Sequence, residues 1–276
     1  MTETSGSDVA AELTTARAQT ALQAARAGAS VAAEHFRSDV AVETKGGDTD
    51  VVTVADREAQ AAVVETVADA YPDDELVGEE GDLRKDVPDE GPAWVVDPVD
   101  GTNNFVRGLR TFATAVAAVV DGEPVAAANV LPAAGDTYVT DGEAVYRDGT
   151  PVTVSDVTEP GLGCVVPTVW WPPERRAEYA RACEGIVSRF ADLRRPGCAQ
   201  AALGRLAAGS LEGVVTNVEC NPWDTVGGVH LVRTAGGRVT NLDGERWRVG
   251  DRGLVASNGH LHDEVLAAAR EIDAEL

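Results

Sequence analysis

The chain has 276 residues, a length that fits one large or two small globular domains. It contains 46 Asp and Glu against 23 Lys and Arg, which gives a formal net charge of −23. This acidity excludes a general nucleic-acid binder, which needs a basic surface to displace counterions from phosphates, and it disfavours docking to an anionic membrane. We therefore expect neither nucleic acid nor a membrane among the partners. Hydrophobic residues make up 44%, enough for a sizeable core, so wholesale disorder is not expected.

The sequence carries no recognisable targeting or membrane-spanning segment. No stretch reaches the roughly 18 uncharged apolar residues of a membrane span, and residues 1–13 lack the basic and apolar regions of a secretory signal. The cysteines have no zinc-site spacing and imply no disulfide framework. We therefore expect a cytoplasmic protein.

The composition is rich in Asp, Glu, Ala and Val, whereas Lys45 and Lys85 are the only lysines. Such a composition resembles that of proteins from salt-accumulating archaea. At molar salt the Debye length shrinks to about 3 Å, so the self-repulsion of an acidic surface is screened. The composition therefore predicts a halophilic protein, with an ordinary acidic protein as the alternative.

In chain order, the first half is predicted to contain two helices and then a mostly antiparallel sheet. The helices are expected at residues 8–37, with Ser7 or Asp8 as the cap, and at 55–71. Strands are expected at 40–45, 75–78 and 93–97, and as several short strands with Asp-Gly turns across 111–156. Residues 81–92 are rich in Gly, Pro and Asp and are expected to form a surface loop.

The second half alternates strands with helices. Strands are expected at 163–168, 211–217 and 253–257, and helices at 173–190, 199–208, 225–235 and 261–274. The whole pattern predicts an α/β fold in which helix and sheet layers alternate as a layered sandwich. We place the boundary between the halves near residues 155–162, which gives an α+β part at 1–158 and an α/β part at 159–276.

Three acidic segments, each beside Gly or Pro, stand out in the sequence. Glu79 follows the strand at 75–78, Asp97 and Asp100 lie in WVVDPVDGTNNF (94–105), and Asp224 lies in WDTVGG (223–228). Two carboxylates in one tight turn repel each other unless a cation lies between them. Oxygen ligands without His or Cys suit a hard ion such as Mg²⁺ or Mn²⁺. The segments therefore predict a site for a hard divalent cation.

The residues after Asp100 fit a phosphate site. Gly101 permits close approach of a ligand to the backbone, and Thr102 can start a helix whose free N–H groups bind phosphate. Each fragment alone also has a plain structural interpretation: Asp97 and Asp100 as turn residues, and Thr102 and Asp224 as helix caps. The combination of three such segments is more specific than any one of them.

The motifs GEE, WVVDPVDGTNNF and WDTVGG, in this order and spacing, resemble those of the inositol monophosphatase family. These are Mg²⁺-dependent, often lithium-sensitive sugar phosphatases. The resemblance covers nearly the whole chain, and Lys45 and the segment VVTVAD, which ends at Asp56, also match in spacing. It implies the layered sugar-phosphatase fold and, with the composition, a haloarchaeal member of the family.

The resemblance implies two or three Mg²⁺ ions, with Mn²⁺ as a substitute. The first ion would be bound by Glu79, Asp97 and the carbonyl of Val99. The second would be bound by Asp97, Asp100 and Asp224, while Glu79 would also face a looser third ion. A pair of ions about 3.5–4 Å apart can activate a water on one side of the phosphate and stabilise the leaving oxygen on the other.

The resemblance also implies the catalytic residues. Asp56 and Thr102 would orient and deprotonate the attacking water, with Glu79 beside them at the metals. The N–H groups of Gly101 and Thr102 would hold the phosphate, and Asp100 would face the substrate near its ester oxygen. No covalent nucleophile is then required, and no His or Cys lies in these motifs.

Two segments of the sequence bear on substrate selectivity. Arg194, Gly197 and Ala199 match an R-x-x-G-x-A segment that lines the substrate side in the family. Asn217 stands seven positions before Asp224, where animal inositol phosphatases carry an acidic residue, so a preference for inositol is in doubt. Arg194 or Arg195 could contact a second phosphate group, with ordinary surface charge as the alternative.

We predict a phosphomonoesterase that hydrolyses inositol 1-phosphate, fructose 1,6-bisphosphate or both, in which metal-activated water attacks directly. One alternative is a 3′(2′),5′-bisphosphate nucleotidase of the same family, although those usually differ from Asn103 and Asn104 in the motif. Another is a non-catalytic, regulatory module that binds sugar phosphates. Homodimer formation and lithium inhibition are family expectations.

Other features have structural interpretations. The run from Trp170 and Trp171 to two prolines is read as a turn before a helix rather than as a sugar platform. Cys198 is read as a small buried residue, and the glycine pair 227–228 as a packing feature rather than a phosphate loop.

Overall fold

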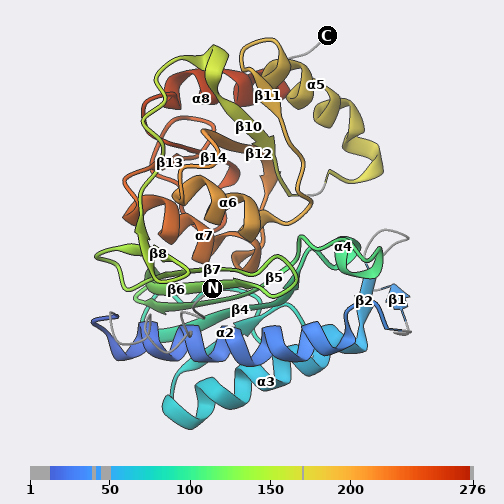
Figure 1. Cartoon of the computed structure of the whole chain (residues 1–276), viewed down its shortest axis with the longest axis vertical. Coiled ribbons are helices and arrows are strands. Elements are labelled where there is room, and N and C mark those ends of the chain that lie inside the picture. Colours follow the sequence, from blue (N-terminus) through green and yellow to red (C-terminus); the bar gives the residue numbers. More distant parts are fainter. Residues whose placement is uncertain (1–12, 39–41, 45–50, 170, 274–276) are drawn as a thin grey trace, which may run out of the picture.

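Two large sheets alternate with three pairs of helices along the long axis of the molecule (Figure 1). The structure is a computed structural model that describes residues 13–38, 42–44, 51–169 and 171–273. Several predicted features lie outside these ranges: the first residues of the expected helix, with its cap residues Ser7 and Asp8, and also Lys45 and Trp170. The layered α/β fold predicted from the sequence is confirmed. Among the described residues, none of the helices is both long and apolar enough to cross a bilayer.

The first layer is the helix pair α2 (Ala16–His35) and α3 (Val54–Ala70), which covers the outer face of the first large sheet (Figure 1). Small residues bring the two helices together: a Cβ added to Gly28 would lie 2.6 Å from Cγ2 of Val63. The expected helix at 8–37 was wrong at its beginning, since the described residues 13–15 precede α2. Thr15 is the N-cap, and its hydroxyl accepts a hydrogen bond from the N–H of Ala18 at 3.2 Å.

The first large sheet has seven strands in sequence order, antiparallel except for the parallel first pair. The strands are β3 (Glu75–Gly78), β4 (Pro92–Asp100), β5 (Ala113–Val120), β6 (Glu123–Leu131), β7 (Asp136–Thr140), β8 (Val145–Arg147) and β9 (Thr150–Val152). Two of the Asp-Gly turns, at 121–122 and 148–149, have positive φ at both residues, which matches the twist of a tight hairpin. A separate small sheet pairs β1 (Val42–Thr44) with β2 (Val51–Thr53).

The second large sheet has five strands in the order β11-β10-β12-β14-β13. These strands are β10 (Cys164–Pro167), β11 (Asp192–Leu193), β12 (Gly213–Glu219), β13 (Arg238–Thr240) and β14 (Arg252–Ser257). Short 3₁₀ turns occur at Pro160–Leu162, Pro173–Arg175 and Glu271–Asp273. The strands β11 and β13 were not predicted from the sequence. The division of the chain at residue 158 stays a prediction.

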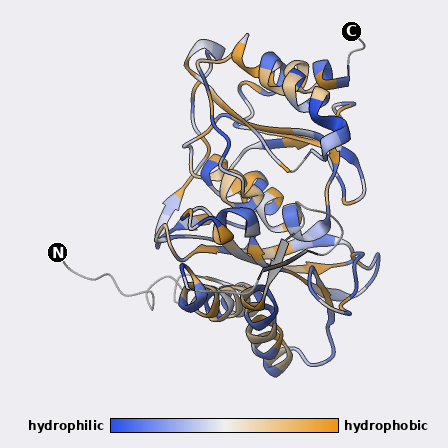
Figure 2. Ribbon diagram, turned by 90° about the vertical axis from the view of Figure 1, so that its right-hand side faces the viewer, coloured by the Kyte–Doolittle hydropathy of each residue, from blue (hydrophilic) through white to orange (hydrophobic). Residues whose placement is uncertain are grey.

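The helices α6 (Ala199–Ala207) and α7 (Pro222–Thr234) lie between the two sheets, and α5 (Arg176–Val187) and α8 (His262–Arg270) cover the far face of the second sheet (Figure 1). Hydrophobic residues concentrate along the strands of both sheets, whereas many loops are hydrophilic (Figure 2). Leu203 and Leu206 of α6 and Leu231 of α7 are fully buried in the core between the sheets. This burial fixes both helices, so their first turns lie near the end of β4.

Candidate metal centre

An irregularity in β4 positions two of the predicted ligands. The expected strand ended at Asp97, with Asp100 on a turn, which is wrong, since β4 continues to Asp100. Asp97 pairs with Ala115 and Asp100 with Ala113, so three steps along β4 match two along β5. Such a bulge accommodates Pro98, which cannot donate to a sheet. Residues three apart in a regular strand point to opposite faces, and the bulge brings both carboxylates to one side.

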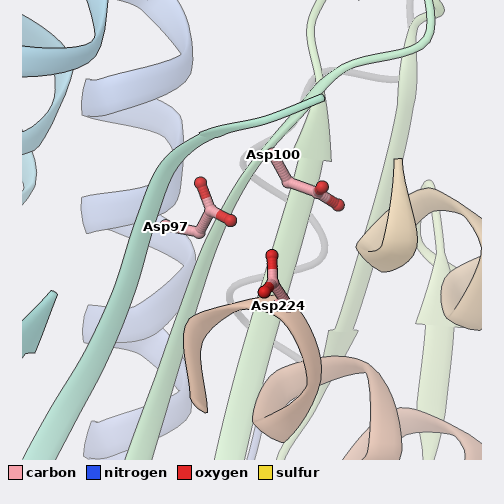
Figure 3. Close-up of side chains that lie close together, drawn as sticks. All are labelled: Asp97, Asp100 and Asp224. Carbon is pink, nitrogen blue, oxygen red and sulfur yellow. The ribbon is translucent and has the colours of Figure 1, made fainter. Parts of the chain in front are cut away.

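The carboxylates of Asp97, Asp100 and Asp224 converge (Figure 3). One oxygen from each lies within 4.8 Å of the others, and Asp97 and Asp100 are buried while Asp224 is half-buried. Asp224 comes from the first turn of α7, whose N-cap is Asn221. The expected helix began at residue 225, which is wrong by three residues. Asp224 is therefore not the cap, and its side chain accepts a hydrogen bond from Nδ2 of Asn221 at 3.1 Å.

The electrostatics of this cluster favour a bound cation. Loss of hydration, followed by repulsion from Glu79, Asp100, Asp224 and Asp56, raises the pKa of Asp97 well above its usual range. Loss of hydration and repulsion from Asp100 and Glu79 raise the pKa of Asp224 to about 8. Each shift means that the folded, metal-free protein disfavours the charged carboxylate. A divalent cation would remove both causes, because it replaces the lost water and neutralises the repulsion.

The first turn of α6 stabilises Asp100. Its carboxylate accepts hydrogen bonds from the N–H of Ala199 at 3.2 Å, the N–H of Gln200 at 2.5 Å and the thiol of Cys198 at 3.0 Å. Burial nevertheless raises the pKa of Asp100, against the lowering effect of these bonds. Burial and the neighbouring carboxylate raise the pKa of the Cys198 thiol, which therefore stays protonated and can donate. The predicted small buried Cys198 thus also contacts a predicted ligand.

Thr102 connects the predicted water-activating pair. Its hydroxyl lies 3.2 Å from Oδ1 of Asp56 and 3.0 Å from the carbonyl oxygen of Val99. Asp56 is buried in the first turn of α3 and Thr102 begins α4 (Thr102–Val106). The structure thus brings together two residues that are 46 positions apart. The N–H of Val99 donates to Oδ1 of Asp97 at 3.1 Å, which leaves its carbonyl directed toward Thr102.

Gly101 is the N-cap of α4 and has φ 90°, a left-handed conformation that favours glycine. A Cβ at this position would lie 3.1 Å from both Cβ of Cys198 and the carbonyl oxygen of Gly197. Gly101 therefore allows β4 to turn sharply into α4 while the segment 197–198 packs against it.

Glu79 is half-buried after β3, outside the three-residue cluster, but close enough to raise the pKa values of Asp97 and Asp224. Lys85 was not predicted as a site residue. Its Nζ donates to the carbonyls of Gly78 at 2.8 Å and Glu79 at 2.9 Å. Lys85 also lies over the ring of Trp223, 5.7 Å from its centroid. A lysine in the loop beside an acidic cluster, in a chain with only one other lysine, is the signal that could have identified it.

The predicted substrate-side residues divide into two groups. The N–H of Ala199 contacts Asp100, and Gly197 lies against the amide of Asn104, so both lie beside the cluster. Arg194 is exposed and forms an ion pair with Asp192. It lines a hollow of about 460 Å³, together with Arg195, Pro196, Arg205 and Ser210 among others.

Asn217 is fully buried in a polar network. Its Oδ1 accepts from Nε1 of Trp171 at 2.7 Å, and its Nδ2 donates to Glu178 and to Asp273. Both the oxygen and the nitrogen of this side-chain amide are bonded within the protein, so a substrate contact by Asn217 stays a prediction. Trp171 is likewise buried, consistent with a structural role.

Comparisons with known proteins agree with this architecture. A model of the inositol monophosphatase family matches residues 14–274. The chain is 32% identical to the fructose-1,6-bisphosphatase/inositol-1-monophosphatase of Thermotoga maritima, covering 85% of this chain and 88% of that protein. It is 31% identical to the Nus factor SuhB of Escherichia coli K12, covering 91% and 94%. Among solved structures, the Thermotoga maritima IMPase superposes with a TM-score of 0.82 at 30% identity, covering 91% and 95%.

The chain belongs to the inositol monophosphatase family, whose members with an assigned activity among these relatives are phosphatases. The donor set fits the Mg²⁺ that this family uses. It consists of carboxylate oxygens that converge within 4.8 Å, with no nitrogen or sulfur ligand among the three residues. The individual roles of the predicted ligands stay predictions.

Proposed function

We propose that the protein is a Mg²⁺-dependent phosphomonoesterase that acts on a small sugar or polyol phosphate. The observation that carries the proposal is the convergence of Asp97, Asp100 and Asp224 beside the pair formed by Asp56 and Thr102. Hydrolysis of a phosphate monoester by water requires a binding site for cations and a proton acceptor close to each other.

Mg²⁺ bound at the carboxylates would supply charge neutralisation and lower the pKa of a water molecule. Within the protein, the hydroxyl of Thr102 orients that water and the carboxylate of Asp56 accepts its proton. The N–H groups of Gly101 and Thr102 hold oxygens of the phosphate. The oxygen of water forms a bond to phosphorus as the bond from phosphorus to the ester oxygen breaks, and the alkoxide takes a proton from solvent.

We propose that the substrate carries a second anionic group in addition to the phosphate that is cleaved. The hollow beside Pro196 contains Arg194, Arg195 and Arg205 but one carboxylate, Asp192, although acidic residues outnumber basic ones two to one in the chain. A sugar bisphosphate fits this charge. The name of the Thermotoga maritima relative, which includes fructose-1,6-bisphosphatase, supports the same substrate class.

The test is a substrate panel in high KCl, with Mg²⁺ or with EDTA, because kcat/KM reports discrimination between substrates. We expect phosphate release from fructose 1,6-bisphosphate and inositol 1-phosphate with Mg²⁺ and none with EDTA. Asp97→Asn should lower the rate by about 100-fold or more, since a metal stabilises the transition state by several kcal/mol. A variant rate within a few-fold of the wild type would contradict the metal assignment.

A regulatory role is the second candidate, which the likeness to the Nus factor SuhB favours. A pure, metal-loaded protein that hydrolyses no ester of a broad panel would support this role over catalysis. Including 3′-phosphoadenosine 5′-phosphate in the panel tests the nucleotidase alternative. A cytoplasmic location, a homodimer and lithium inhibition stay predictions.

A further inference from the structure

Gln200 connects the supports of two predicted metal ligands that come from different halves of the chain. Its backbone N–H donates to Oδ2 of Asp100 at 2.5 Å, and its side-chain Nε2 donates to the carbonyl oxygen of Trp223 at 2.6 Å. Trp223 is the residue directly before Asp224. One residue of α6 therefore holds the end of β4 with its main chain and the first turn of α7 with its side chain.

The orientation of this amide is fixed by Asn129 of β6. Nδ2 of Asn129 donates to Oε1 of Gln200 at 2.8 Å, which leaves Nε2 of Gln200 to face Trp223. Both side chains are buried, with 1% and 0% of their surface exposed. Oδ1 of Asn129 has no hydrogen-bond partner among the described residues, so the hydrogen bonds of this buried amide go to Gln200 alone.

The glycine pair of α7 makes room for this contact. A Cβ on Gly228 would lie 2.5 Å from Cβ of Leu203 and 2.9 Å from Oε1 of Gln200. Without side chains at this place, α7 approaches α6 closely enough for the Gln200 amide to reach Trp223. The glycines at 227–228 are thus a packing feature, as predicted, and this packing also allows Gln200 to contact the first turn of α7.

We infer that Gln200 is a positioning residue that sets the distance between Asp100 and Asp224 and thereby the affinity for the cation that these two carboxylates share. The inference rests on the proposed function. Residues that support metal ligands without touching the metal typically change its affinity by about 10-fold to 100-fold when they are altered. Gln200 does this for two ligands at once, through its main chain and its side chain.

The test uses Gln200→Met, which keeps the length of the side chain and the backbone hydrogen bond to Asp100. It removes the two hydrogen bonds of the side-chain amide, to Asn129 and to Trp223. Mn²⁺ binding to the purified full chain is titrated by electron paramagnetic resonance and calorimetry. We expect the weaker of the bound ions to bind about 10-fold more weakly. At saturating Mg²⁺ the rate should recover to within a few-fold, because the ligands themselves are intact.

Asn258→Ala is the matched control for lost stability. Asn258 is a buried amide that bonds Ser155, Val157 and Leu261, none of which belongs to the acidic cluster. It should lower the melting temperature and leave Mn²⁺ affinity unchanged. Asn129→Ala, which keeps the bond from Gln200 to Trp223, should give an intermediate loss of affinity and provides a second test should Gln200→Met fail to fold.

Mn²⁺ affinity in Gln200→Met within two-fold of the wild type would overturn the positioning role, as would an equal loss in Asn258→Ala. A wild-type chain that binds Mn²⁺ but hydrolyses no ester would overturn the proposed function alone. The two failures are therefore distinguishable.

Discussion

The three converging aspartates oppose folding when no cation is bound. Asp97 and Asp100 lose most of their hydration, and each aspartate lies in the field of other carboxylates. The first turn of α6 compensates Asp100 in part, because its N–H groups and the positive end of the helix dipole face the carboxylate. The residues that bind the cation are thus expected to cost the metal-free protein stability.

Replacing one charge tests this cost. In EDTA at pH 8, Asp224→Asn should raise the free energy of unfolding by about 1 kcal/mol, because a repelled carboxylate becomes a neutral amide. The same variant should lose most of the stabilisation that Mg²⁺ gives the wild type. Urea unfolding of both proteins, with EDTA and with Mg²⁺, measures the two effects. A variant that is less stable than the wild type in EDTA would contradict the repulsion argument.

Gly101 permits a test of backbone geometry with an internal control. Gly101→Ala should lower the free energy of unfolding by about 3 kcal/mol, because a positive φ and contacts at 3.1 Å act together. Gly135 has a similar φ of 83° but nothing within 4 Å of an added Cβ, so Gly135→Ala should cost about 1 kcal/mol from φ alone. Activity should fall in the first variant and not in the second. Equal costs by urea unfolding would show that crowding at Gly101 is unimportant.

At the scale of elements, periodicity predicted the buried segments well. The helices α3 and α6 and the hairpins with Asp-Gly turns follow from local patterns and were found where expected. The bulge of β4 was not predictable, because it depends on pairing with β5, which no local signal in Asp97–Asp100 records. The short strands β11 and β13 also depend on their partners, since two or three residues carry too little periodicity to be recognised.

The residues of the candidate site that belong to a sequence motif were predictable. The residues whose contacts depend on tertiary packing were not. The acidic residues and Thr102 were found from their motifs. Gln200 and Asn129 were missed, although a carboxamide inside an otherwise apolar run such as AQAAL is a readable sign of a buried polar contact. For Asn217, spacing alone gave no indication that Trp171, Glu178 and Asp273 occupy its amide.

The beginning of α2 offers a prediction whose sign depends on the boundary. If α2 begins at Ala16, Thr15→Ala removes an N-cap and should lower the free energy of unfolding by about 1 kcal/mol. If the helix began near residue 8, Thr15 would lie inside it, and the same change should raise stability by about 0.5 kcal/mol. Chemical unfolding decides between the two signs, and Thr15→Ser, which keeps the hydroxyl, should match the wild type.

At the scale of the whole molecule, the cluster lies where hydrogen bonds join the end of the first large sheet to the helix layer between the sheets. Nδ2 of Asn104 donates to the carbonyl of Pro196 at 2.7 Å, close to where Asp100 accepts from Ala199 and Gln200. A cation bound by Asp97, Asp100 and Asp224 would add a link between β4 and α7. Metal binding should therefore stabilise both parts of the molecule together, rather than one part alone.

The pH dependence of folding is a property of the whole chain because two histidines with lowered pKa values lie in different layers. Burial lowers the pKa of His230, in α7, to about 4. Burial and the nearby Arg238 lower the pKa of His262, in α8, to about 4 as well. The ring nitrogens of His262 lie 2.8 Å from the Ser257 hydroxyl and 3.0 Å from that of Thr240. Both rings are therefore neutral in the folded protein at pH 7.

Both histidines lower acid stability, and the sign follows from proton linkage. An unfolded histidine has a pKa near 6.5, so between about pH 6.5 and pH 4 the unfolded chain binds more protons than the folded one. Stability is therefore constant with respect to these groups above about pH 6.5 and falls as the pH is lowered toward 4. Each should contribute a loss of about 2 kcal/mol between pH 7 and pH 4.5.

In His262→Gln, the difference between urea unfolding free energies at these two pH values should shrink by that amount, because glutamine does not titrate. An unchanged difference would mean that His262 already takes up a proton in the folded protein, which would require the ring to reach water or a carboxylate at the junction of β14 and α8.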